Sequence, residues 1–189
     1  MYFGNLRIGF FREISYNAIM QEKSEQIVLG IDPGTRITGF GVVFLTRQKI
    51  EVIDYGCIRL PTKERLSYRY FLLFNAFQKL IAKHQPNEVA VEAQYLDRNF
   101  ATTAKLSGVK AALGIATETA GIALHEYSAT KAKKAVTGSG LASKLQVQRT
   151  LQTLLQLKEL PQPEDASDAL SLAYCHANAL LFQARCMNI

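Results

Sequence analysis

From residue 27 onward, apolar and polar positions follow first a strand-like and then a helical pattern. Three apolar runs separated by short polar turns predict an antiparallel meander of strands over Ile27–Ile31, Gly39–Leu45 and Ile50–Ile58. Further strands are predicted over Glu88–Glu92 and Ile122–Glu126, and helices over Tyr68–Lys83, Asn99–Ala120, Ser128–Val136, Lys144–Leu157 and Asp165–Ala184. This order predicts an α/β fold with a mixed five-stranded sheet flanked by helices.

The first 26 residues differ from the rest of the chain. They carry scattered aromatic residues without a clean period, and Met20 lies shortly before the first predicted strand. One hypothesis is that translation starts at Met20. A targeting peptide is the alternative, because Arg7 and Arg12 precede any acidic residue, but no continuous apolar core follows. We expect a leader over 1–26, one domain over 27–184 and a short tail over 185–189.

Composition indicates a soluble, cytoplasmic globular protein. The chain has 189 residues, of which 48% are hydrophobic and 20% charged. No run approaches the ~18 apolar residues of a membrane span, so no membrane contact is expected. The odd number of cysteines and the absence of a CxxC pair fit a reducing compartment (Cys57, Cys175, Cys186). The histidines lie far apart in the sequence, so they are not expected to cluster and a zinc site is not predicted (His84, His125, His176).

The positive charge is concentrated in one segment. The net charge is +6, and the segment from Arg98 to Arg149 holds eight basic and two acidic residues, so the remainder of the chain is neutral. Such a segment suits a polyanion such as nucleic acid. A solvated basic face explains the charge alone equally well.

Four carboxylates occupy positions from which they can converge. Asp32 ends the first predicted strand and Glu92 ends the fourth, while Asp165 and Asp168 open the last helix three residues apart, on one face. Each carboxylate also has a purely structural explanation: Asp32 as a turn residue, Asp165 as a helix cap, and Glu92 and Asp168 as surface acids. Together, they predict a site for hard divalent cations, because clustered carboxylates repel one another unless cations bind. Two Mg²⁺ ions at such a site support phosphodiester hydrolysis.

Four ordered motifs resemble one known family. The stretches "GIDPGTRITGFGVV", "VAVEAQYLDRNFATTAKLSGVKA", "GSGLASKLQVQ" and "EDASDALSLA" are similar in order and spacing to those of RuvC, the bacterial Holliday-junction endonucleases. The resemblance spans about residues 27–179. It implies an RNase H-like fold and a homodimer that cuts two opposed strands of a four-way DNA junction during recombination and repair. It also implies Mg²⁺ as cofactor, with Mn²⁺ as a possible substitute, and RuvA and RuvB as partners.

The resemblance also implies roles for single residues. It assigns the metal-binding and catalytic roles to Asp32, Glu92, Asp165 and Asp168, places Lys133 and Lys144 near the DNA, and puts Tyr95 where an aromatic lies at the junction centre. A tyrosine there can stack on an unpaired base, although packing at the strand end is the alternative. The basic segment supplies further candidates for DNA contact: Arg98, Lys105, Lys131 and Lys134.

Symmetry and two rival functions complete the expectations. A two-fold junction favours a C₂ dimer. The Asn99–Ala120 helix is the expected interface, because its small residues would permit close packing (Ala104, Gly108, Ala111, Ala112). The alternative is that these residues pack on the protein's own sheet. An actin-like ATPase also uses an Asp-x-Gly-Thr turn, but it needs a second phosphate loop and a second lobe. A non-catalytic junction-binding relative is the other rival.

Overall fold

The computed structural model describes residues 25–93 and 100–187. Within them a five-stranded sheet has the order β3-β2-β1-β4-β5. The first three strands are antiparallel neighbours, β1 (Gln26–Asp32), β2 (Ile37–Leu45) and β3 (Ile50–Arg59). The last two run parallel to β1, β4 (Glu88–Glu92) and β5 (Ala123–Tyr127). The predicted mixed sheet is therefore confirmed. The expectations for the leader, Met20 included, and those for Tyr95 and Arg98 concern residues outside the described part.

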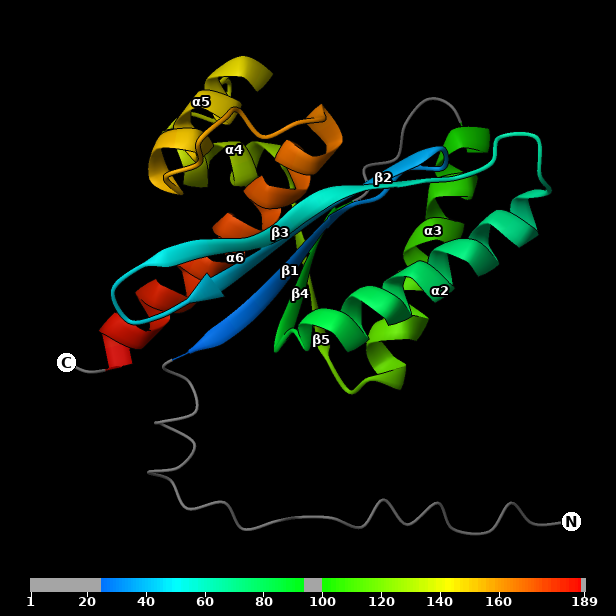
Figure 1. The fold of residues 1–189 in the computed structure, drawn as a ribbon, viewed down its shortest axis with the longest axis horizontal. Coiled ribbons are helices and arrows are strands. Elements are labelled where there is room, and N and C mark those ends of the chain that lie inside the picture. Colours follow the sequence, from blue (N-terminus) through cyan, green and yellow to red (C-terminus); the bar gives the residue numbers. More distant parts are fainter. Residues whose placement is uncertain (1–24, 94–99, 188–189) are drawn as a thin grey trace, which may run out of the picture.

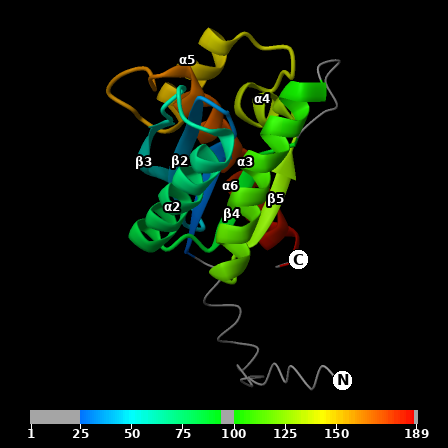
Figure 2. The ribbon, with the colours of Figure 1, turned by 90° about the vertical axis from the view of Figure 1, so that its right-hand side faces the viewer.

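Helices cover both faces of the sheet (Figures 1 and 2). On one face lie α2 (Leu66–His84) and α3 (Phe100–Thr119), which pack on each other and enclose Phe77, Leu73 and Leu113. On the other face α6 (Glu164–Met187) crosses the sheet, with α4 (Ala129–Thr137) and α5 (Lys144–Leu154) packed against it. The sheet is thus the middle layer of three, and its buried apolar strands match the continuous apolar runs in the sequence.

Two helix ends differ from the sequence prediction. Helix α5 ends at Leu154 rather than Leu157, because Gln156 adopts a left-handed conformation with φ of 52°. The turn places Leu155 in the core beside α6. Helix α6 continues to Met187, so the tail expected from residue 185 begins as helix.

The long α3 helix uses part of its small-residue stripe internally. A β-carbon at Gly108 would overlap the ring of Tyr70 on α2, and Ala112 is buried against the sheet. Ala104 and Ala111 are exposed, and Ile115 is 59% exposed. The small residues are therefore divided between the protein's own core and its surface. The alternative prediction, that they pack within the protein rather than in a dimer interface, holds for part of them.

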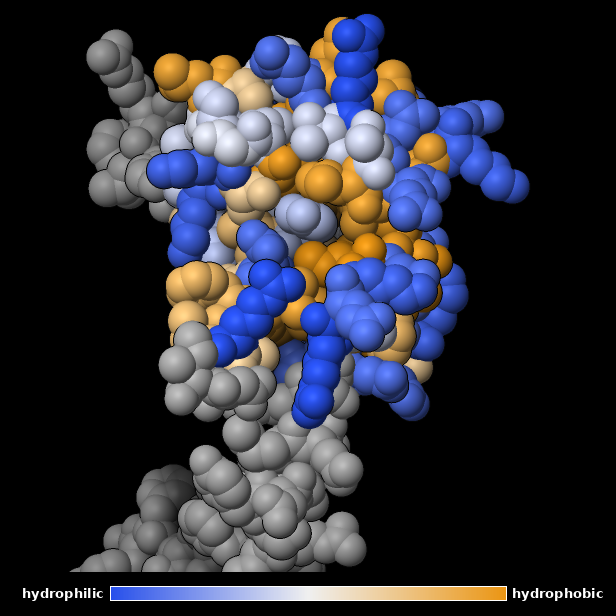
Figure 3. Space-filling model, turned by 90° about the vertical axis from the view of Figure 1, so that its left-hand side faces the viewer, coloured by the Kyte–Doolittle hydropathy of each residue, from blue (hydrophilic) through white to orange (hydrophobic). Residues whose placement is uncertain are grey.

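The end of the molecule at which α6 finishes has a mixed surface. Apolar side chains are uncovered across the middle of this face, and hydrophilic side chains surround them (Figure 3). Phe182 on α6 is 69% exposed. In the described part of the chain, no helix has both the length and the apolarity needed to cross a bilayer.

Close approach of α6 to the sheet depends on glycines in β1 and β2. A β-carbon at Gly39 would overlap the carbonyl oxygen of Asp165, and one at Gly30 would overlap that of Ala169. Both strands therefore let the α6 backbone rest almost directly on them. This contact sets the position of the first turn of α6 relative to the ends of the strands.

We predict that Gly39→Ala destabilises the fold and lowers nuclease activity. The added methyl group has only backbone to displace, so a loss of about 1–3 kcal/mol is expected, seen as a lower midpoint of thermal unfolding. Gly114→Ala is the matched control, because nothing lies within 4 Å of its β-carbon position. That exchange in a helix should stabilise by up to about 1 kcal/mol. Equal midpoints for the two variants would contradict the prediction.

Candidate active site

Asp32 and Glu92 lie side by side at the ends of two parallel strands. Ile31 of β1 pairs with Val91 of β4, so the next residues of both strands are Asp32 and Glu92. Alternation along β1 places Asp32 on the same face as Gly30, which is the face covered by α6. The two carboxyl groups are close enough that the charge of Glu92 and a hydrogen bond to it both act to raise the pKa of Asp32.

The first turn of α6 brings the other two acids to the same place. Helix α6 begins at Glu164, directly over Gly39 of β2, which is the register partner of Asp32. The preceding loop is held by a hydrogen bond of 3.1 Å that Gln148 Nε2 donates to the Pro161 carbonyl. Asp165 and Asp168 are close enough to act on the charge of Asp32. All four predicted carboxylates are therefore brought together.

This grouping strongly disfavours ionisation of Asp32. Its pKa is raised to about 8 from an ordinary value of 3.8, first by burial, then by the charge of Glu92 and the hydrogen bond to it, and then by Asp168 and Asp165. Carboxylate oxygens are the donors that a hard divalent cation such as Mg²⁺ prefers, and a bound cation would favour the ionisation that the cluster by itself disfavours. The residues present therefore fit a divalent metal site.

Lys144 partly neutralises the cluster. Its Nζ lies 3.0 Å from Glu164 Oε2 and 3.4 Å from Asp168 Oδ2. Burial raises the pKa of Asp168, although Lys144 and Lys133 both act to lower it. In return, the hydrogen bond to Glu164 is the main reason that the pKa of Lys144 is raised. Lys144, predicted as a DNA contact, is thus also an ionic partner of the acidic cluster.

Two further residues near the cluster were missed in the sequence. Glu164 precedes Asp165 and could have been included from its position alone. Cys57 on β3 pairs with Gly39, and burial followed by the charge of Asp165 raises the pKa of its thiol. No local signal points to Cys57, because its place depends on strand pairing.

The structure separates the predicted DNA-contacting lysines into groups. Lys133 of α4 and Lys144 of α5 lie near Asp168. Lys131 and Lys134 instead line a hollow between α4 and the C-terminal half of α6, with Lys131 Nζ 4.7 Å from the centre of the Tyr127 ring. Lys105 is exposed on α3.

The expectation that the histidines do not cluster is wrong for two of them. The rings of His125 and His176 stack with centroids 4.3 Å apart, and both approach Glu88. His125 lies on β5 and His176 on α6, so strand and helix packing unites residues far apart in the sequence. His84 pairs elsewhere, with Asp54 at 3.1 Å.

A sheet of this topology with acids at adjacent strand ends and at the start of the crossing helix defines the RNase H-like class of metal-dependent nucleases. Comparison with known proteins identifies the family. The family described as "Crossover junction endodeoxyribonuclease RuvC" matches residues 28–176. The chain belongs to the RuvC family, and it is a crossover junction endodeoxyribonuclease.

Individual relatives agree with this assignment. The RuvC of Protochlamydia amoebophila is 47% identical over 154 residues, which cover 82% of this chain and 92% of the relative. The RuvC of Heliobacterium modesticaldum is 36% identical over 85% of this chain and 99% of its own length. A solved structure of T. thermophilus RuvC in complex with Holliday junction substrate superposes with a TM-score of 0.73 at 26% identity, covering 84% of this chain and 95% of that one.

Proposed function

We propose that this protein resolves four-way DNA junctions by hydrolysing one phosphodiester bond in each of two opposed strands, at a site formed by Asp32, Glu92, Asp165 and Asp168. The observation that carries the proposal is the convergence of these four acids around Asp32. The relative from T. thermophilus was solved with a Holliday junction substrate, which supports the choice of DNA. The family also favours action in recombination and repair, in the cytoplasm, with RuvA and RuvB as partners.

We infer that the cofactor is Mg²⁺, with two ions per site and Mn²⁺ as a possible substitute. Such ions supply an activated water and stabilise the departing oxygen of the phosphodiester. Asp32 and Glu92 hold their ligand oxygens on strand ends, which are rigid. Asp165 and Asp168 complete the ligand set from a helix whose height over the sheet is fixed by glycine contacts. Cleavage is proposed to leave 5′-phosphate and 3′-hydroxyl ends.

The experiment for this proposal is cleavage of a synthetic four-way junction by the full chain, with Mg²⁺ or with EDTA. Symmetric nicks in opposed strands that require the metal ion are expected. Binding without cleavage on junctions of varied sequence would instead support the non-catalytic alternative. A duplex of the same sequence is the control for junction selectivity. The ATPase alternative is not favoured, because the chain belongs to a nuclease family.

We propose that Lys133 and Lys144 hold DNA phosphates beside the carboxylates. Replacing both with alanine should weaken junction binding and make its salt dependence shallower, by about 0.9 in the slope of log K against log salt for each phosphate that is no longer neutralised. Fluorescence anisotropy in EDTA at several salt concentrations measures this. Lys49→Ala is the control, because Lys49 is an exposed residue paired with Glu51 at 2.7 Å in the β2–β3 hairpin. An unchanged slope in the double variant would contradict the assignment.

Roles in DNA contact are also proposed for Tyr95, Arg98, Lys105, Lys131 and Lys134.

We further propose a homodimer, because paired cleavage needs two active sites related by two-fold symmetry. The exposed face of α3 with Ala111 and Ile115 is the candidate contact. Ile115→Asp should shift the protein from dimer to monomer in gel filtration with light scattering. Phe182→Asp is the control, since this side chain is also exposed but lies on α6. A wild-type monomer at micromolar concentration would count against the dimer.

A further inference from the structure

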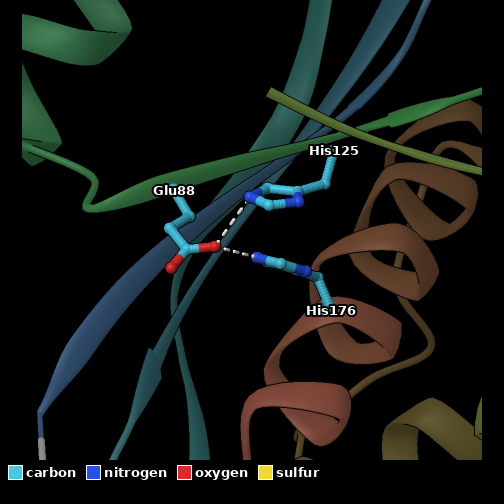
Figure 4. A group of neighbouring side chains, drawn as sticks. All are labelled: Glu88, His125 and His176. Carbon is cyan, nitrogen blue, oxygen red and sulfur yellow. Dashed lines mark hydrogen bonds and ion pairs between the residues drawn. The ribbon is translucent and has the colours of Figure 1, made fainter. Parts of the chain in front are cut away.

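Glu88, His125 and His176 form a compact group (Figure 4). Glu88 and Glu92 are an even number of residues apart in β4, so the group lies on the same face of the sheet as the carboxylates. Glu88 begins β4, His125 lies on the neighbouring β5, and His176 reaches them from α6. The Nε2 atoms of His125 and His176 lie 2.8 Å and 2.6 Å from the same oxygen, Glu88 Oε2. One donor atom from each of the three residues lies within 4.8 Å of the others.

This group is separate from the four carboxylates. Glu88 and Glu92 are the first and last residues of β4, and four residues of strand span about 13 Å. The group also differs in chemistry, because two of its three donors are imidazole nitrogens. Imidazole favours zinc and related transition metals, whereas Mg²⁺ favours oxygen ligands.

A small cavity opens on the group. It has a volume of about 250 Å³, and its lining includes Glu88, His125, His176 and Gln26. His125 is 40% exposed in its side chain, whereas His176 is almost fully buried. A bound ion would therefore have protein donors on one side and room for water on the other, as a site with an open coordination position has.

Two buried polar atoms at this place have no hydrogen-bond partner among the described residues. Gln26 is 9% exposed, and its Oε1 atom is buried and unpaired. The Nε2 atom of His125 is also buried without a hydrogen bond, since its short contact with Glu88 lacks hydrogen-bond geometry. A buried nitrogen without a hydrogen bond is costly, and a cation at the group would give the His125 nitrogen a partner, with the Gln26 amide lining the same cavity.

We propose that Glu88, His125 and His176 bind one divalent transition-metal ion of the zinc class, at a site distinct from the carboxylate cluster. Two histidines and one glutamate are a known donor set for zinc. The ion would join β4, β5 and α6 at the end of the sheet away from Asp32. By binding only the folded chain, it would stabilise the fold.

Tyr127 supplies the outer partner that a metal-bound histidine needs. Its hydroxyl lies 2.7 Å from Nδ1 of His176. With no ion bound, the hydroxyl donates to Nδ1 while Nε2 carries the ring proton. With an ion on Nε2, the ring proton moves to Nδ1 and the hydroxyl accepts it, so the hydrogen bond is kept.

The test uses the full chain, stripped of metal and then held in millimolar Mg²⁺ so that the carboxylate site is occupied. Zn²⁺ binding is measured by calorimetry, and Co²⁺ is used as a coloured probe of nitrogen ligation. We expect one Zn²⁺ per chain, a rise in the thermal midpoint, and visible Co²⁺ absorption bands of a low-coordinate site. Asp32→Asn should leave all three unchanged.

The variants His125→Gln and His176→Gln should each weaken Zn²⁺ binding by more than about tenfold, because losing a ligand costs more than losing an outer partner. His84→Gln is the matched control, since His84 pairs with Asp54 outside this group and its replacement should leave Zn²⁺ binding unchanged. If His176→Gln does not fold, His125→Gln decides, because its side chain is partly exposed. The absence of Zn²⁺ binding by wild type, or binding that His125→Gln leaves intact, would overturn the proposal.

Discussion

We expect Asp32→Asn to remove junction cleavage while junction binding persists. Glu92, Asp165 and Asp168 all act on Asp32, so its charge is expected to be needed to hold the ions, whereas junction binding is expected to rest on the basic side chains. A loss of at least about 10³-fold in the cleavage rate is expected, since metal ions contribute several kcal/mol to such a transition state. Single-turnover cleavage of a labelled junction and binding in EDTA measure the two effects separately.

Asp54→Asn is the matched control for this substitution. Asp54 lies on β3 and pairs with Lys83 at 2.7 Å on α2, away from the carboxylate cluster. Its variant should cut at the wild-type rate. If Asp32→Asn retained cleavage within about tenfold of wild type, the carboxylate would not be a required metal ligand. If it lost binding as well, the residue would act through the fold instead.

Without metal ions, the wild-type protein should lose stability as the pH rises from about 4 to 8, relative to Asp32→Asn. The pKa of Asp32 is raised to about 8 in the folded protein, mainly by burial and by Glu92, from 3.8. The folded protein then holds a proton that the unfolded chain releases. The resulting stabilisation is complete below about pH 4, and it is lost as the pH rises through 8.

Thermal unfolding of both proteins at pH 5 and pH 8, in EDTA and in Mg²⁺, measures this effect. In EDTA, the free energy of unfolding of wild type relative to the variant should fall by a few kcal/mol between pH 5 and pH 8. Each kcal/mol lowers the thermal midpoint by about 2–4 °C in a chain of this size. In Mg²⁺ the loss of wild-type stability between pH 5 and pH 8 should be much smaller, because the ion binds the ionised carboxylates of the folded wild type and stabilises it. An EDTA difference that is independent of pH would mean that Asp32 is ionised throughout this range in the folded state.

Local sequence patterns were sufficient for the elements and for the four acids. The apolar runs predicted all five strands. Strands β1, β2 and β4 are largely buried between the helix layers, and the edge strands β3 and β5 are mostly half-buried. Asp32 and Glu92 could be chosen because each directly ends such a run. Asp165 and Asp168 could be paired because residues three apart share one face of a helix.

Other features depend on distances that only packing sets. Helix α5 stops early, at Leu154, because the core contacts of Leu155 outweigh an uninterrupted helical pattern and Gln156 turns the chain. Lys144 was expected at the DNA, and its contacts with Glu164 and Asp168 depend on how α5 meets the start of α6.

The difference between the two sites of this protein has one physical cause. The carboxylates lie at the ends of strands and at the start of a helix. The order of these elements along the chain indicates which ends meet, so the residue pattern was enough to predict the acidic cluster. Glu88, His125 and His176 lie at positions that no local period distinguishes. Their meeting depends on the register of β4 against β5 and on the height at which α6 crosses the sheet, and both were decided only when the chain folded.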